Sequence, residues 1–309
     1  MAVAEAKSEI EYSMGSRPQG FGLVAVRWTL KNLCSAVSCL NSYSVSGAWR
    51  VLRRLGVRHV RARHHVHSPD PLYQEKFEHV LSIVRDFDPE RQVLYFFDQV
   101  SVHLQPSASY DWVESSVPQP LARQGHRADK ALRICGALNA FTGDFEAIVR
   151  NQITVPALIE FFKTLTHKHP GKIVQIVLDN WPVHVHPNVL AALQVQLYPF
   201  ERKVPASWAN LKPQKKYLKM NLPVQLHFLP TYASWLNPIE KVWKMLKQDL
   251  VHNHPFTDRF DVLKKHIVQW CNKPPHEPNS ILRYVGLLAH VGLFSNAFNC
   301  AFTNMSKNV

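Results

Sequence analysis

Three carboxylate residues are the part of this sequence best suited to chemistry. Asp98 and Asp179 each directly follow an apolar run typical of a strand, and Glu240 lies within the segment 237–243. An acid held against a buried strand or on a packed helix is costly unless a cation offsets its charge. A divalent metal ion is the natural candidate, because carboxylate oxygens are its preferred ligands. In a basic chain, metal-bound carboxylates point to phosphodiester chemistry on nucleic acid.

Each acid also has a structural explanation. Asp98 and Asp179 would be turn-forming residues at the ends of strands. Asn237 is a good N-cap, and Glu240 follows it by three residues, which is the capping-box position, so the segment alone favours a structural role for Glu240. Ligands of α/β sheets bind beyond strand ends, however, and two aspartates in such positions favour a site.

The composition narrows the class of partner. Lys and Arg total 36 against 23 Asp and Glu, which gives a formal net charge of +13 and favours a polyanionic partner. The five cysteines are scattered without a CxxC pair, so neither a disulfide framework nor a zinc module is indicated, and a reducing intracellular setting is expected. No run approaches the roughly 18 apolar residues needed to cross a bilayer, so we expect no membrane partner.

A basic module occupies the N-terminal part of the chain, since residues 12–69 contain no acid. We expect one helix over about 28–37 and a second that is capped by Ser44 or Ser46 and ends near Gly56. Two short helices with a basic second member are typical of a helix-turn-helix that binds DNA, although a solvated basic face on an ordinary helical pair is the alternative. The arginines expected to contact DNA are Arg50, Arg53, Arg54, Arg58, Arg61 and Arg63.

The remainder of the chain alternates strand and helix patterns, which predicts the α/β class with a mixed sheet flanked by helices and a small N-terminal all-α module. The expected strands cover residues 93–97, 131–140, 145–150, 173–178 and 224–229, and the expected helices cover 73–87, 154–167 and 238–250. The expected divisions are the module at 20–65, a connector at 66–91, a catalytic domain at 92–255 and a C-terminal helical segment at 256–309.

The segments around the acids resemble the catalytic blocks of mariner-related insertion-sequence transposases of the DDE superfamily. Phe96-Phe97-Asp98 matches the first block, and Leu178-Asp179-Asn180-x-Pro182-x-His184 is similar to the second. The third block, Leu229-Pro230-Thr231-Tyr232-Ala233-x-x-Leu236-Asn237-Pro238-Ile239-Glu240, is the most specific, because it is far longer than a capping box requires. The segment from Val45 to Gly56 is similar to the second helix-turn-helix of the same family.

This resemblance implies an RNase H-like domain in which Asp98, Asp179 and Glu240 bind two Mg²⁺ ions, with Mn²⁺ as a substitute. The implied activity is a DNA transposase that cuts transposon ends and joins the freed 3′-hydroxyl to target DNA. The implied partners are double-stranded DNA and a second copy of the chain in a synaptic complex. We expect the protein in the cytoplasm, associated with the DNA of the nucleoid.

Further residues are expected to support the site. Asn180 and Asn237 flank the acids, and His184 would contact phosphate or the leaving oxygen, or be a simple packed histidine.

A basic insertion at about 198–223 would contact DNA or form a solvated loop. Family members often carry two N-terminal DNA-binding modules, and from the number of residues before Arg27 we expect only the second of them here.

Other functions remain open from the sequence. An inactive or shortened transposase remnant would act only as a DNA-binding protein. An RNase H-like host nuclease or resolvase would use the same acids but would not need a module that reads sequence.

Overall fold

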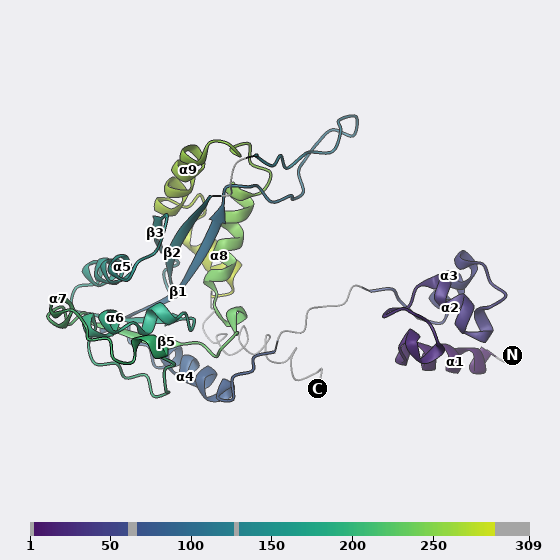
Figure 1. The fold of residues 1–309 in the computed structure, drawn as a ribbon, viewed down its shortest axis with the longest axis horizontal. Helices are drawn as coiled ribbons and strands as arrows, with labels where there is room; N and C mark the ends of the chain where they lie inside the picture. The colour runs from purple at the N-terminus through teal and green to yellow at the C-terminus, as the bar shows by residue number, and fades with distance from the viewer. Residues whose placement is uncertain (1–2, 61–66, 127–129, 288–309) are drawn as a thin grey trace. The chain divides into compact units, whose positions relative to one another are not determined.

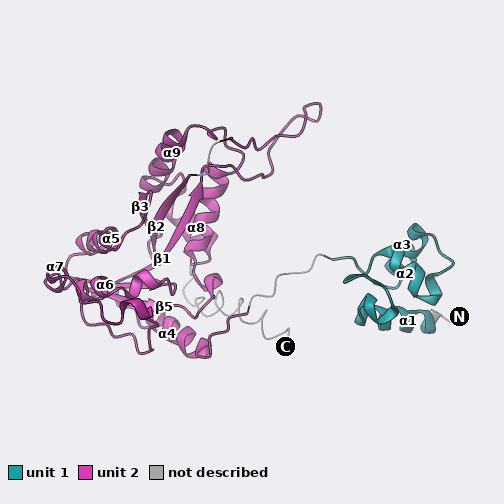
Figure 2. Ribbon diagram, in the orientation of Figure 1, with its two compact units in different colours: residues 1–66 teal, residues 67–309 magenta. Residues whose placement is uncertain are grey.

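The chain divides into two compact units, Met1–Val66 and His67–Val309 (Figure 1, Figure 2). The computed structural model describes residues 3–60, 67–126 and 130–287. Arg61 and Arg63 lie outside the described residues, as does the part of the expected C-terminal segment after residue 287. Over the described ranges, no helix is both long enough and apolar enough to cross a membrane.

The first unit is helical, and its caps follow from the sequence. The Oγ1 of Thr29 accepts a hydrogen bond from the N–H of Asn32, and the Oγ of Ser44 accepts one from Gly47. Gly56 ends the last helix with a φ of 80°, a left-handed conformation that glycine adopts without strain. The second helix, its cap at Ser44 and its end are therefore confirmed. The helices are α1 (Val3–Gly15), α2 (Leu30–Ala36) and α3 (Val45–Arg54).

The helix α1 lies before residue 20, where the basic module was expected to begin, and it packs on that module. Ile10 joins the buried residues of α2 and α3 in one apolar cluster. The carboxylate of Glu9 accepts hydrogen bonds from the backbone N–H groups of Ser38 and Cys39, at 2.7 and 3.1 Å. These contacts attach α1 to the turn between the two later helices.

The second unit is built on a five-stranded mixed sheet in the order β3-β2-β1-β4-β5. The hairpin pairs β1-β2 and β2-β3 are antiparallel, whereas β1-β4 and β4-β5 are parallel. The α/β class and the mixed sheet flanked by helices are confirmed. The strands are β1 (Gln92–His103), β2 (Ala131–Asn139), β3 (Phe145–Arg150), β4 (Ile173–Leu178) and β5 (Val224–Phe228).

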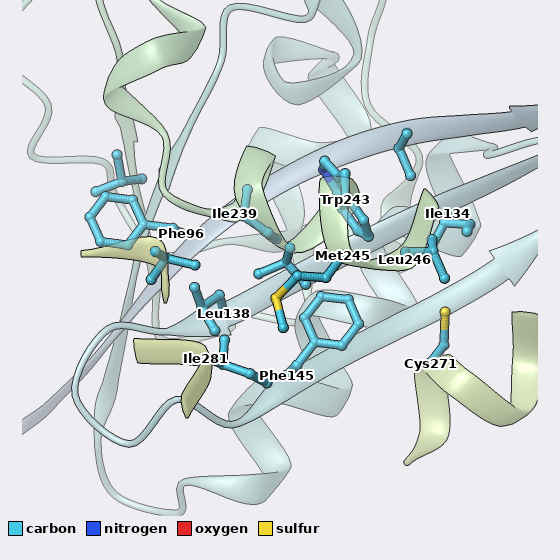
Figure 3. Close-up of a cluster of buried hydrophobic side chains, with 14 of the residues drawn as sticks. Phe96, Ile134, Leu138, Phe145, Ile239, Trp243, Met245, Leu246, Cys271 and Ile281 are labelled. Atoms are coloured by element: carbon cyan, nitrogen blue, oxygen red, sulfur yellow. The ribbon is translucent and has the colours of Figure 1, made fainter. Parts of the chain in front are cut away.

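Helices cover both faces of this sheet because alternate strand residues are apolar on each side. One cluster joins Phe96, Ile134 and Trp243 with helices α4 (Tyr73–Arg85), α8 (Ile239–Leu246), α9 (Phe260–Asn272) and α10 (Pro278–Val285). Figure 3 shows the part of this cluster in which Trp243 and Phe145 meet. The other cluster joins the opposite face with helices α5 (Val155–Lys168) and α6 (Pro187–Ala192).

The expected basic insertion at about 198–223 is folded rather than a simple solvated loop. Tyr198, Tyr217 and Leu222 are buried in the second cluster, and the short helix α7 (Lys215–Leu218) lies within the segment. Its lysines remain exposed.

Strand β1 is longer than predicted, which corrects the position of Asp98. We expected a strand over 93–97 with Asp98 at its end, but β1 continues to His103. The apolar alternation continues through Val100 and Val102, which are buried and pair with β2. Only the parallel pairing with β4 stops early, at Phe96.

A chain of buried polar side chains joins α4 to the sheet. The Nε2 of His227 lies 2.7 Å from the Oε1 of Gln175, and its Nδ1 lies 3.0 Å from the Nε2 of His79. Because an amide oxygen only accepts, His227 donates to Gln175 and accepts from His79. Burial, followed by the nearby His79, lowers the pKa of His227 to about 3, so its ring is neutral.

This buried histidine should make the protein sensitive to acid. In the unfolded chain the imidazole of His227 is protonated near pH 6.5, whereas in the folded protein it stays neutral down to about pH 3. The free energy of unfolding therefore decreases as the pH falls from about 6.5 toward 3, by up to about 1.4 kcal/mol per pH unit. His227→Gln should flatten the pH slope of the unfolding free energy between pH 6.5 and 4, measured by urea melts. His167→Gln, on an exposed position of α5, is the control that should keep the slope. An unchanged slope in the His227 variant would contradict the assignment.

Candidate active site

The register of two parallel strands brings Asp98 and Asp179 together. Phe96 of β1 and Val177 of β4 form the last registered pair. Each aspartate follows one of these partners by two residues, so both reach the same level and, by strand alternation, the same side of the sheet. On its other flank Asp98 pairs with Gly136 of β2.

Glu240 lies in the first turn of α8, and the capping box that could have explained it is not formed. The Nδ2 of Asn237 instead donates to the carbonyl oxygen of Phe97 at 2.9 Å. The Oδ1 of Asn237 is buried and has no hydrogen-bond partner among the described residues. The structural explanation for Glu240 is therefore wrong, and Asn237 ties the start of α8 to β1 one residue before Asp98.

Trp243 joins α8 to the first acid directly. Its Nε1 donates to the Oδ2 of Asp98 at 2.9 Å, and its ring is 1 % exposed. The approach depends on Gly136, because a Cβ added there would lie 2.5 Å from Cη2 of Trp243 and 2.8 Å from Phe145. The missing side chain of Gly136 thus makes room for the tryptophan that orients Asp98.

Burial and neighbouring acids disfavour the ionised forms of Asp98 and Glu240. Burial first, and then the charge of Glu240, raise the pKa of Asp98 to about 7, with a smaller contribution from Asp179. The hydrogen bonds from the backbone of Gln99 and from Trp243 act in the opposite direction. Burial also raises the pKa of Glu240, and Asp179 adds to this against Lys247. Carboxylates that disfavour one another's ionisation form a place where a cation is strongly favoured.

The turn after β4 holds Asp179 near the surface. Its side chain is 51 % exposed, and its Oδ1 accepts from the N–H of Trp181 at 3.1 Å. His184 lies behind it with Nδ1 3.2 Å from the Asp179 carbonyl oxygen. The ring of His184 is 1 % exposed and meets Phe97 and Trp181 edge-on, so it is a packed histidine that supports the turn.

Asn180 connects the ends of the two parallel strands. Its Nδ2 donates to the carbonyl oxygen of Leu229 at 2.6 Å, just after β5. The side chain therefore fixes the backbone next to Asp179, and it is a positioning residue in this structure.

The acids suit a metal ion that shares its ligands with a substrate. Over residues 3–60, 67–126 and 130–287, no group of three or more His, Cys, Asp or Glu side chains is placed to hold a metal ion, so the protein alone offers no metal cage. Mg²⁺ rarely uses such a cage, since it is usually held by one or two carboxylates together with waters and substrate phosphates. The oxygen-only donors Asp98, Asp179 and Glu240, with the raised pKa of Asp98, fit such an ion.

The first unit presents the expected basic side chains to solvent. Arg50, Arg53, Arg54 and Arg58 are exposed. The guanidinium of Arg53 lies over the ring of Trp49 at 5.7 Å, and Trp49 is itself 51 % exposed.

Sequence reasoning missed part of the site. It did not identify the hydrogen bond that Trp243, a buried core residue, donates to Asp98. The available signal was the spacing, because Trp243 follows Glu240 by three residues and so lies on the same side of α8.

The sequence matches two known protein families. Residues 93–263 match the family of DDE superfamily endonucleases, and this span contains all three acids. The chain belongs to the DDE superfamily of endonucleases. Residues 25–80, which include α2 and α3, match the winged helix-turn-helix family. The expected family, with a DNA-binding module ahead of a DDE domain, is confirmed.

Individual relatives are distant. The protein of Shigella sonnei described as "Insertion element IS630 uncharacterized 39 kDa protein" is 23 % identical over 252 residues, which cover 80 % of this chain and 65 % of the relative. The match thus spans just under two thirds of that protein's length.

The solved structures establish the fold. The Mos1 transposase paired-end complex with left transposon end is 16 % identical with a TM-score of 0.59, covering 97 % of this chain and 78 % of that one. The Mos1 mariner paired end complexes with Mn and with Mg each give a TM-score of 0.58 at 16 % identity, covering 93 % of this chain and 75 % of theirs.

The raised pKa of Asp98 predicts a cost to stability that a metal should remove. Its folded pKa of about 7 exceeds the ordinary 3.8, so at pH 8 ionisation opposes folding by about 4 kcal/mol. Asp98→Asn should therefore raise the melting temperature at pH 8 in EDTA by several degrees. Mg²⁺ should raise the melting temperature of the wild type but not of the variant.

Differential scanning fluorimetry checks both parts. Asp111→Asn, which alters an exposed acid, is the control and should leave both values unchanged. A lower melting temperature for Asp98→Asn in EDTA would contradict the electrostatic account.

Proposed function

We propose that this protein is a DNA transposase that cuts the ends of its element and joins the freed 3′-hydroxyl to target DNA. The observation that carries the proposal is the β1-β4 register, which aligns Asp98 with Asp179 beneath the helix that bears Glu240. A DNA-binding remnant would have no need to keep Asp98 partly buried near the charges of Glu240 and Asp179. A nuclease acting on DNA structure would not need the helix-turn-helix unit.

The side chains of the site have separate tasks in this mechanism. Asp98, Asp179 and Glu240 would hold two Mg²⁺ or Mn²⁺ ions, which supply water activation and neutralise charge on the leaving 3′-oxygen. Trp243 holds one oxygen of Asp98 in place. Asn237 keeps α8 against β1, which fixes the position of Glu240 relative to Asp98.

The helix-turn-helix unit would deliver the DNA end. Arg50, Arg53, Arg54 and Arg58 are exposed cations on and just after α3, where phosphate contacts would supply most of the affinity. Trp49 restrains Arg53 by lying under its guanidinium. Arg61 and Arg63, outside the described residues, belong to the same proposal through the sequence alone.

We also propose a homodimer on DNA, in the cytoplasm at the nucleoid. Among the described residues a chain has one set of catalytic acids and one basic helical unit, so two ends require two chains. The paired-end complexes of Mos1 support this by likeness. Exposed apolar side chains on the segment between β1 and β2, such as Tyr110, Trp112 and Leu121, offer surface that a second copy could cover.

Replacing each acid should separate catalysis from binding. Asp98→Ala, Asp179→Ala and Glu240→Ala should each reduce Mg²⁺-dependent strand cleavage by at least about a thousandfold, because losing one metal ligand removes several kcal/mol of transition-state stabilisation. Binding to the same DNA in EDTA should stay within about twofold. The DNA is a duplex selected by the full chain from a random library, cleavage is followed on denaturing gels, and Glu160→Ala on α5 is the control. Full cleavage by any acid variant would rule out this set of catalytic residues, and binding without wild-type cleavage would favour the remnant.

The arginines of α3 should carry the salt dependence of DNA binding. Arg53→Ala and Arg54→Ala should each weaken binding and reduce the slope of log affinity against log salt by about 0.9 per lost phosphate contact. Arg91→Ala, at an exposed position before β1, removes the same charge and should keep the slope. Fluorescence anisotropy over a salt series measures both, and unchanged slopes for the α3 variants would remove this helix from the interface.

A further inference from the structure

A cavity of about 270 Å³ opens at the edge of the sheet where β4 and β5 end. Asn180, directly after Asp179, forms one wall, and Phe228 at the end of β5 forms another. Tyr198, Arg202 and Lys203, from the basic insertion, close the remaining side. The cavity therefore lies at the carboxyl end of the parallel strands, the same edge that carries Asp179.

One of its cations is already neutralised. Lys76 of α4 lines the cavity, but its Nζ lies 2.8 Å from the Oδ2 of Asp70. Burial would raise the pKa of Asp70, yet the hydrogen bond from Lys76 and those from the backbone of Thr231 and Leu72 outweigh it and set the pKa at about 2. This ion pair is complete within the fold and leaves Lys76 little charge to offer a ligand.

Arg202 differs, because part of its guanidinium is buried without a partner. Its Nη1 has no access to solvent and no hydrogen bond among the described residues. A buried donor left unsatisfied costs about 1–3 kcal/mol, and more when it is charged. The rest of the Arg202 side chain lines the cavity, where a ligand can reach it. The adjacent Lys203 is exposed and adds a second cation, against one acid, Glu201, on the rim.

The chemistry of the cavity suits one kind of ligand. A guanidinium presents parallel N–H donors that match two oxygens of a phosphate, and an ammonium beside it adds charge. Because the cavity adjoins Asp179 through Asn180, a phosphate bound there would lie on the strand that passes through the active site.

We propose that Arg202 and Lys203 form a subsite for a backbone phosphate of the DNA strand that occupies the catalytic centre. The subsite rests on the proposed function and deepens it, since it assigns part of the basic insertion to holding the reacting strand. Arg202 and Lys203 are positioning residues, and their contact would fix the strand next to Asp179.

The test uses the full-length chain in EDTA, so that it does not depend on cleavage. Arg202→Met keeps the stem of the side chain and removes the charge. It should weaken binding of the selected duplex about tenfold and lower the salt slope by about 0.9. Its melting temperature without DNA should be unchanged or higher, because an unsatisfied buried charge has gone. Lys203→Met, at an exposed position, should weaken binding in the same direction without disturbing the fold.

Two matched controls sharpen the result. Lys212→Met removes one charge from the same insertion, does not line the cavity, and should leave affinity and slope unchanged. Duplexes with a single neutral methylphosphonate should reveal one position whose replacement weakens the wild type but not Arg202→Met.

The proposal is overturned if Arg202→Met binds DNA like the wild type, if Lys212→Met weakens binding equally, or if no methylphosphonate position is lost in the variant. Inorganic phosphate could instead raise the melting temperature of the wild type but not of Arg202→Met, while the salt slope of DNA binding is the same for both. That result would assign the cavity to free phosphate and would also overturn the proposal. If the wild type and the variants bind DNA as expected but the wild type cleaves no DNA, the catalytic function is refuted and the phosphate subsite is not.

Discussion

The structure depends on keeping Asp98 partly buried although the charges of Glu240 and Asp179 oppose its ionisation. Burial and the charge of Glu240 raise the pKa of Asp98 to about 7, so an ionised Asp98 opposes folding at neutral pH and above. A fold keeps such an arrangement only when the surrounding packing fixes it, and strain of this kind is typical of functional sites. The rest of the second unit can be understood as the scaffold that opposes this repulsion.

The scaffold is the junction of α8 with β1 and β2. Trp243 and Asn237 make hydrogen bonds from the helix to Asp98 and to the residue before it, and both are buried. Gly136 permits the approach, because any side chain there would collide with the tryptophan. The apolar stripe of α8 therefore does two things at once, since it closes the core and sets the distance between Glu240 and the strands.

The sequence predicted what local patterns determine. Strand β4 and the start of α5 at Thr154 were expected where they occur, because an apolar run and a threonine cap are local signals. The length of β1 was not, since its second half is stabilised by β2, which lies far along the chain. The capping-box explanation of Glu240 failed for a similar reason: Asn237 is drawn to a carbonyl of β1, a partner that no short segment reveals.

The most direct test of the account is where divalent cations bind. Anomalous diffraction from crystals of the full chain with bound DNA and Mn²⁺ should locate ions among the carboxylate oxygens of Asp98, Asp179 and Glu240, with DNA phosphate oxygens completing their coordination. Manganese bound only elsewhere, with these three side chains contacting protein or water alone, would contradict the account.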